Sequence, residues 1–313
     1  MNDIQIIDSG QIQISQAITP DLYRRYINYL DVSAKTADTY NKALKQLFNY
    51  FTENGITQPG RQDILSFRSE LEASGHKPTT IQNYITAIRL FFRWTEQENL
   101  YPNIADHIKG AKLNREHKKD YLTAAQCKQI LDGIEQDTLR GKRDYAIMVL
   151  MLTGGLRTIE VARANIEDLR TAADCTVLYV QGKGKQEKAD YIKISDYAEK
   201  VLRAYFKARG KADPKSPLFA SLDHKNQGGR MTTRSISRIA KSTMQAAGFD
   251  SDRLTAHSLR HTAVTLSLLA GEKLEDVQQF ARHSNIATTM IYNHALDKAK
   301  NNCSAAISAA LFN

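Results

Sequence analysis

Apolar residues recur at helical spacing along most of this 313-residue chain, and one segment alone carries a clear β pattern. The segment is CTVLYVQGKGKQEKADYIKIS, residues 175–195, in which alternating, β-branched runs flank a Gly-Lys-Gly-Lys turn. This pattern predicts a β-hairpin. The sequence after it is again mostly helical, apart from the short apolar run PLFAS. We therefore expect a mainly α protein with a small β-hairpin or sheet.

Residues 19–102 carry four successive helical patterns. In SAKTADTYNKALKQLFNYF, residues 33–51, the aromatic and leucine side chains lie on one face at helical spacing. The pattern repeats at residues 79–99, while Pro20 fits a first helical turn and Gly75 fits a C-terminal cap. These features predict a small helical bundle that follows an N-terminal extension of residues 1–18.

Residues 103–119 turn polar and basic and lose their apolar periodicity, which predicts a basic linker between two domains. The second domain, residues 120–302, opens with Thr123 as a candidate N-cap. The nearly all-apolar KRDYAIMVLMLTGG predicts a buried helix ending at a double glycine, and TIEVARANIEDL predicts another helix. Residues 303–313 form a tail.

Bulk composition narrows the class of protein. No apolar run reaches the length of a transmembrane helix, and the N-terminus lacks the pattern of a signal peptide, so we expect no membrane association. The three cysteines are far apart and odd in number, which fits a reduced, cytoplasmic chain without a disulfide framework or zinc site.

Positive charge is concentrated in the second part of the chain. The net charge is +9, with −1 in residues 1–110 and +10 in residues 111–313. A basic domain favours a polyanion partner, most often nucleic acid. The alternative is a basic protein without such a partner.

Several polar side chains are candidates for chemistry, and each has a structural explanation when taken alone. Arg157 and Glu160 could form a surface pair on one helical face, and Lys183 could be a solvated turn residue. His257, three residues before Arg260, could be an N-cap or a buried structural histidine. His283 could pack in a loop, and Tyr292 is one of 14 tyrosines.

Taken together, these residues stand in the order Arg, Lys, His-x-x-Arg, His, Tyr, with 26 positions from Arg157 to Lys183 and 23 from Arg260 to His283. With the motifs TGGLRTIE, GKGK, HSLRHT and HSNIATTMIYNH in this order, the chain resembles the tyrosine recombinase (integrase) family. The resemblance covers the second domain from Leu122 onward. It extends to the preceding helices, which look like the family's core-binding, SAM-like domain.

The resemblance implies a site-specific recombinase that cleaves and rejoins DNA through a 3′-phosphotyrosine, for integration or excision of a mobile element. Tyr292 would be the nucleophile, and Arg157 and Arg260 would bind the phosphate oxygens with their forked donors. Lys183 would protonate the leaving 5′ oxygen, His257 would assist proton transfer, and His283 would donate a further hydrogen bond. Glu160 would support Arg157. No metal or other cofactor is expected.

The resemblance also implies partners. They are double-stranded DNA with specific recombination sites and a homotetramer on paired sites, with room for an accessory protein that sets direction. The apolar face of the tail, with Ile307, Ala310 and Leu311, would dock on a neighbouring protomer or pack on its own domain. The candidate DNA contacts in the first domain are Lys35, Thr36, Lys42, Lys77, Thr79, Thr80 and Asn83.

Two alternatives stay open at this point. A type IB topoisomerase uses the same phosphotyrosine chemistry to relax DNA, and a DNA-binding regulator would have lost catalysis. One departure from the family pattern also stands out, because Arg282 occupies a position where the family often has glycine.

Overall fold

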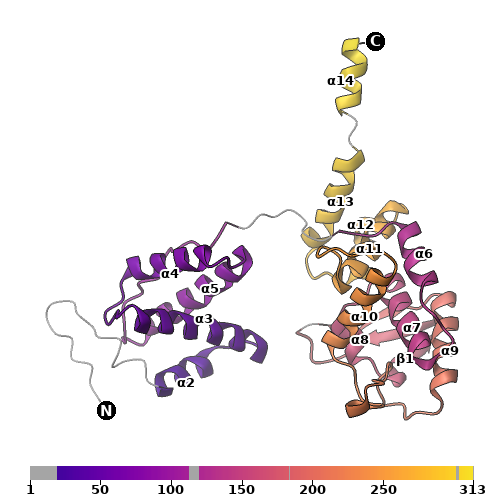
Figure 1. Cartoon of the computed structure of the whole chain (residues 1–313), viewed down its shortest axis with the longest axis horizontal. Coiled ribbons are helices and arrows are strands. Elements are labelled where there is room, and N and C mark those ends of the chain that lie inside the picture. The colour runs from indigo at the N-terminus through magenta and orange to yellow at the C-terminus, as the bar shows by residue number, and fades with distance from the viewer. Residues whose placement is uncertain (1–19, 113–119, 183, 301–302, 313) are drawn as a thin grey trace. The chain divides into compact units, whose positions relative to one another are not determined.

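The computed structural model describes residues 20–112, 120–182, 184–300 and 303–312, and the chain divides into two compact units near residue 116 (Figure 1). The first unit contains helices only. The second unit is helical around one small antiparallel sheet. The predicted fold class, mainly α with a small sheet, is confirmed.

The first unit is a four-helix bundle of α2 (Pro20–Tyr29), α3 (Ala34–Glu53), α4 (Arg61–Ala73) and α5 (Pro78–Gln97). Ser33 caps α3 by accepting a hydrogen bond from the Thr36 amide, and Pro78 occupies the first turn of α5. The bundle core is apolar and largely aromatic. Phe91 lies at its centre, with ring centroids 5.1 Å from Tyr26 and 5.3 Å from Phe92.

Part of the predicted linker belongs to this bundle. Ala105 and Ile108 are fully buried in the core of the first unit, although the local sequence shows no apolar periodicity. Arg68 donates to the carbonyl of Lys109 at 2.8 Å, which holds this segment against α4. Two apolar residues three positions apart are too few for a periodic signal, so this packing could not be predicted from the sequence. Residues 113–119 lie outside the described residues.

The helices of the second unit surround α7 (Leu139–Thr153), whose side chains are buried on nearly every face. This is the buried helix that the apolar run predicts, and it ends at Gly154. Around it lie α6 (Ala124–Asp132), α9 (Asp196–Arg209), α10 (Thr233–Ala246) and α11 (Ala256–Leu269). Thr123 caps α6, as predicted, through a reciprocal pair of hydrogen bonds with Gln126.

The sheet has three antiparallel strands in the order β1 (Leu169–Ala172), β2 (Cys175–Val180) and β3 (Asp190–Lys193). The β2–β3 hairpin is the predicted one, and Leu178 pairs with Ile192 across it. The first strand was missed. It has only four residues, including Arg170 and Thr171, so its apolar content is too low to predict a strand. It forms a strand because it pairs with β2.

The helix predicted from TIEVARANIEDL is shorter than expected. It forms α8 (Thr158–Arg163), and a 3-10 turn follows at Ile166–Asp168. The helix stops because the carbonyl of Ala164 accepts a hydrogen bond from the Leu218 amide at 2.8 Å instead of an intrahelical donor. Leu218 lies in the predicted apolar run PLFAS, which is buried and forms isolated bridges rather than a strand.

The last helices are α12 (Leu274–Ala281), α13 (Ile286–Lys300) and α14 (Cys303–Phe312). The tail is therefore helical, and its apolar side chains are exposed, with Ile307 59% and Leu311 69% accessible. Within the described part of the chain, no helix is long and apolar enough to span a membrane.

Candidate active site

The loop between α7 and α8 places Arg157. Gly155 has a φ of +55°, and a Cβ there would lie 3.0 Å from the Phe280 ring, so both the backbone angle and the packing favour glycine. This turn ends α7 and makes Arg157 the N-cap residue of α8. The arginine in TGGLRTIE is thereby brought to the surface of α12, where its Nη2 donates to the Arg282 carbonyl at 3.3 Å.

Glu160 lies beneath Arg157 and is fully buried. Its Oε1 accepts from Arg157 Nη1 at 2.8 Å, and its Oε2 accepts from the Arg157 amide at 2.8 Å. Burial alone would raise the pKa of this carboxyl, but the charge of Arg282 and the hydrogen bonds from both arginines make the net shift downward. Glu160 is therefore ionised and ties the side chain of Arg157 to its own helix turn.

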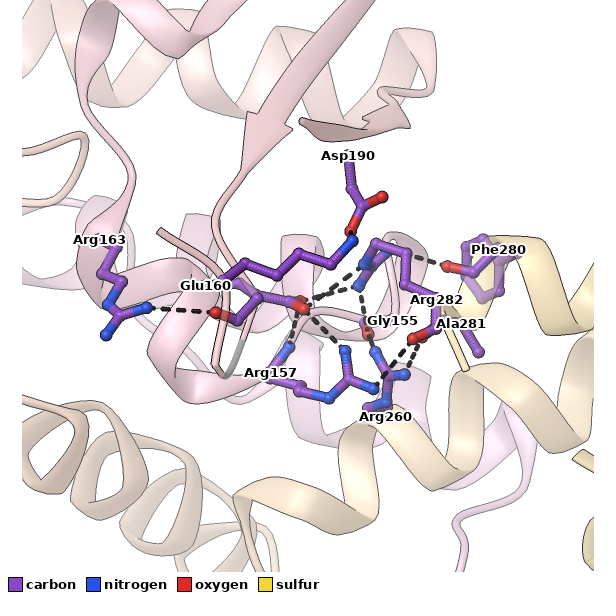
Figure 2. Close-up of polar contacts among 11 residues, drawn as sticks. Gly155, Arg157, Glu160, Arg163, Asp190, Arg260, Phe280, Ala281 and Arg282 are labelled. Atoms are coloured by element: carbon purple, nitrogen blue, oxygen red, sulfur yellow. Dashed lines mark hydrogen bonds and ion pairs between the residues drawn. The ribbon is translucent and has the colours of Figure 1, made fainter. Parts of the chain in front are cut away.

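Arg260 projects from α11 toward the same loop, and its side chain is 1% exposed. It donates to the carbonyl of Gly155 at 2.6 Å and to the carbonyl of Ala281. Burial and the neighbouring Arg157 and Arg282 charges lower its pKa to about 9. The side chains of Arg157 and Arg260 thus lie next to each other beside Gly155, as Figure 2 shows.

Tyr292 on α13 is buried against α11, and its ring centroid lies 4.5 Å from His261 and 6.2 Å from His283. Burial raises the pKa of the phenol, and the charges of Arg260 and Arg157 act in the opposite direction. The phenol is therefore protonated at neutral pH and is influenced by both guanidiniums.

His283 lies just after α12, and its Nδ1 is 2.9 Å from Thr289 Oγ1. Its pKa falls to about 4, first because of burial and then because of the positive charges of Arg260, Arg157, Arg282 and His257. A neutral imidazole next to Tyr292 can donate or accept one hydrogen bond according to its tautomer. His257 is exposed one turn before Arg260 on α11.

The structure thus brings together six of the predicted residues: Arg157, Glu160, His257, Arg260, His283 and Tyr292. The seventh, Lys183, lies outside the described residues. Its predecessor Gly182 is described, and the Gly182 carbonyl accepts from Arg163 Nη1 of α8 at 3.2 Å, so the β2–β3 connection is anchored to the helix that carries Glu160.

Sequence reasoning missed one residue of this cluster. Arg282 appeared only as a departure from the family pattern, yet its guanidinium contacts Glu160. His261 on α11 packs in the same cluster, since its ring is stacked with Tyr121 at 5.9 Å and lies 4.5 Å from the ring of Tyr292. The two histidines of HSLRHT are four positions apart, which predicts that His257 and His261 lie one helical turn from each other.

The candidate DNA-contact residues lie near the beginnings of α3 and α5 and are exposed or half-buried. The exposed members are Lys35, Lys42, Lys77, Thr79 and Asn83, and the half-buried ones are Thr36 and Thr80. The Thr36 hydroxyl already hydrogen-bonds within the α3 cap, because it lies 2.9 Å from Ser33 Oγ. Among the residues that the structure describes, no group of three acidic, histidine or cysteine side chains is arranged to hold a metal ion.

Solved structures share the fold of this chain. The structure resembles that of XerH site-specific recombinase bound to palindromic difH substrate, with a TM-score of 0.74, 20% identity, and coverage of 94% of this chain and 86% of that chain. It also resembles a lambda integrase dimer bound to a COC′ core site, with a TM-score of 0.68, 17% identity, and coverage of 87% and 97%. The fold is that of DNA recombinases.

Sequence comparison gives the family. The phage integrase family model matches residues 120–299, and its N-terminal SAM-like domain model matches residues 21–99. A tyrosine recombinase of Synechocystis is 29% identical over 83% of this chain and 86% of its own length. XerD of Listeria innocua is 28% identical over 88% and 94%. The chain therefore belongs to the phage integrase family of tyrosine recombinases, enzymes that break and rejoin DNA strands, as its motifs predicted.

Proposed function

We propose that the protein is a site-specific recombinase that cleaves and rejoins DNA through a 3′-phosphotyrosine at Tyr292, for integration or excision of a mobile element. The observation that supports this most directly is that Arg157 and Arg260 lie beside the Gly155 turn and that both charges act on the buried phenol of Tyr292. Two buried or half-buried guanidiniums next to a buried phenol make a site suited to a phosphodiester.

The two arginines take the electrostatic role. Both guanidiniums donate to protein acceptors, and we assign their further donors to the nonbridging oxygens of a bound phosphate. At rest, burial keeps the Tyr292 phenol protonated. Once the phosphate is bound, the arginines stabilise the charge that develops on it as the phenol attacks.

The covalent step is a transesterification. Tyr292 Oη forms a bond to phosphorus, the bond from phosphorus to the 5′ oxygen breaks, and the tyrosine proton passes to a base. We assign proton acceptance to His257, which lies exposed at the start of α11, and protonation of the 5′ oxygen to Lys183. His283 supplies a hydrogen bond to the phosphate from its neutral ring. The reverse sequence rejoins the strand and needs no external energy source.

The proposed partners are double-stranded DNA with specific sites and further copies of this chain, four on a pair of sites, with an accessory protein setting direction. A DNA substrate of this kind would place the enzyme in the cytoplasm. The exposed apolar residues of α14 support docking on a neighbouring protomer, since an isolated apolar helix face gains stability when it is covered.

Deleting residues 303–313 tests the docking proposal. We expect the truncated protein to fold and to bind a single site like the full chain, and to lose the assembly of two sites, as measured by native gel shift and light scattering. Normal paired-site assembly and recombination by the truncated protein would contradict this role of α14.

Covalent trapping tests the proposed function. Wild type, Tyr292→Phe and the control Tyr191→Phe, whose ring is exposed on β3, are each incubated with nicked duplexes selected by wild-type binding from a random pool. Denaturing gels should show a protein–DNA adduct for wild type and Tyr191→Phe only. Tight binding without any adduct would instead favour the DNA-binding regulator.

A supercoiled plasmid separates the recombinase from the topoisomerase. We expect recombination only between selected sites, and relaxation of plasmids that lack such sites would favour a type IB topoisomerase. A plasmid dimer carrying two sites, compared with an excision substrate, distinguishes dimer resolution from mobile-element excision. This comparison is informative because XerC and XerD proteins are among the relatives.

A further inference from the structure

Arg282 has a backbone conformation that an arginine rarely adopts. It ends α12 with φ 52° and ψ 47°, the left-handed region that favours glycine. Glycine would satisfy the backbone better, so the side chain must supply something that glycine cannot.

The side chain of Arg282 is 7% exposed and its guanidinium is held by acceptors from three segments. Nη1 donates to the Phe280 carbonyl at 2.7 Å, and Nη2 donates to Glu160 Oε2 at 2.8 Å and to the Gly155 carbonyl at 3.1 Å. Figure 2 shows this guanidinium on the same side of the Gly155 turn as Glu160. The side chain therefore joins the turn before Arg157 to the end of α12 before His283.

Glu160 is the link to Arg157. Its two oxygens receive hydrogen bonds from Arg157 and from Arg282, so one buried carboxylate is shared by two guanidiniums. Without Arg282, Arg157 would be the remaining strong partner of this carboxylate and would be drawn more tightly onto it. Sharing the carboxylate leaves Arg157 Nη2 with only a 3.3 Å contact to the Arg282 carbonyl, which a phosphate oxygen can replace.

We propose that Arg282 is a positioning residue that sets the geometry of Arg157, through Glu160, and of His283, through the end of α12. This inference rests on the proposed DNA cleavage. It assigns the left-handed arginine a role in the site rather than in folding alone.

The test compares Arg282→Gly, Arg282→Lys and the control Ala173→Gly. Ala173 also has a positive φ, 50°, but lies in the β1–β2 turn, so its replacement reports the effect of relaxing such a backbone away from the site. Each protein is assayed on the selected nicked duplexes for single-turnover adduct formation, for DNA binding by gel shift, and for thermal melting.

For Arg282→Gly we expect adduct formation to slow by roughly 10- to 100-fold, as for a misplaced catalytic group, with DNA binding and melting close to wild type. Added methylguanidinium should restore part of the rate in this variant and leave wild type unchanged. The rate for Arg282→Lys should lie between those of wild type and Arg282→Gly, because an ammonium keeps the positive charge but lacks the paired N–H donors of a guanidinium. An unchanged rate for Arg282→Gly would overturn the proposal. So would a slower rate that methylguanidinium does not restore and that comes with a clearly lower melting temperature, because the variant would then be damaged in its fold.

A second readout does not depend on cleavage. In protein without DNA, the His283 ring is titrated by NMR, with its signal assigned from the His283→Gln spectrum. Arg282→Gly removes one of the charges facing His283, the others being Arg260, Arg157 and His257, so the His283 pKa should rise above the wild-type value. The same titration in both proteins would contradict the proposed action of Arg282 on His283 even if wild type formed no adduct, whereas a missing adduct alone would count against the proposed function.

Discussion

The two units bury different kinds of side chain. Among the described residues of the helical bundle, the buried core is apolar and aromatic, and Thr95 is the one buried polar side chain. Among its described residues, the second unit also buries acidic, basic and imidazole side chains, and these are Arg143, Glu160, Asp168, Arg260 and His261. Burial of apolar side chains stabilises the first unit. In the second unit, some of the buried side chains are charged and are held away from water.

This difference separates folding from chemistry. Apolar burial lowers the free energy of the folded state, while a buried charge raises it unless hydrogen bonds and opposite charges compensate. Around Gly155, three guanidiniums lie near a single carboxylate; Arg157 and Arg282 donate to Glu160, whereas Arg260 donates to the Gly155 carbonyl, so the positive charge is only partly compensated. The excess positive charge is the feature that a bound phosphate would neutralise.

The largest expected effect concerns the bundle core. Phe91→Ala should destabilise the first unit by about 3–5 kcal/mol, because it leaves a cavity among the surrounding aromatic rings. Calorimetry should show one melting transition shifted and the other unchanged. A single transition that shifts as a whole would mean that the two units do not unfold separately.

Arg260→Met should affect chemistry rather than folding. We expect adduct formation to fall by about 100- to 1,000-fold, because a preorganised donor to the phosphate is lost. Melting of the second unit should change little, because relief of the desolvation cost and of like-charge repulsion offsets the loss of hydrogen bonds to the Gly155 and Ala281 carbonyls. Arg253→Met, an exposed arginine just before α11, is the control and should cleave normally. A strong loss of stability in Arg260→Met would remove the contrast between the two units.

His283 gives a smaller, pH-dependent effect. Its pKa is about 4 in the folded protein against 6.5 for the free side chain, so the unfolded chain binds more protons between these values. Stability should therefore fall as pH decreases through this window. Urea unfolding at about pH 7 and about pH 5 should show a smaller loss for His283→Gln than for wild type. Equal losses would mean that His283 titrates normally.

The smallest effect is expected at the surface of the bundle. Lys77→Ala should weaken DNA binding by less than about tenfold and lower the slope of its salt dependence by about 1, as for one phosphate contact. Lys207→Ala, exposed on α9, is the matched control. Gel shifts over a salt series that give the same slope for Lys77→Ala and wild type would exclude Lys77 from the DNA interface.

Periodic elements of the fold could be predicted from the sequence. The bundle helices, α7 and the β2–β3 hairpin each carry enough residues for their own pattern to define them. β1 and the burial of Ile108 could not be predicted, because both depend on partners elsewhere in the chain. The early end of α8 also depends on a distant residue, because the Leu218 amide donates to the Ala164 carbonyl in place of a donor from the same helix.

The candidate site divides in a similar way. The order and spacing of the motifs predicted which residues to look for, because each motif has a local signature. The place of Arg282 could not be predicted, since it depends on a left-handed backbone and on a carboxylate 122 positions earlier in the chain. The family often has glycine at this position, whereas this chain has an arginine. The structure shows that its guanidinium joins those of Arg157 and Arg260.

Mass spectrometry of the trapped complex identifies the residue that carries the DNA, and so tests Tyr292 as the nucleophile. After digestion of protein and DNA, we expect a nucleotide remnant linked through phosphate to Tyr292, and no such species in Tyr292→Phe. A remnant on another of the 14 tyrosines, or on a different type of residue, would show that Tyr292 is not the nucleophile.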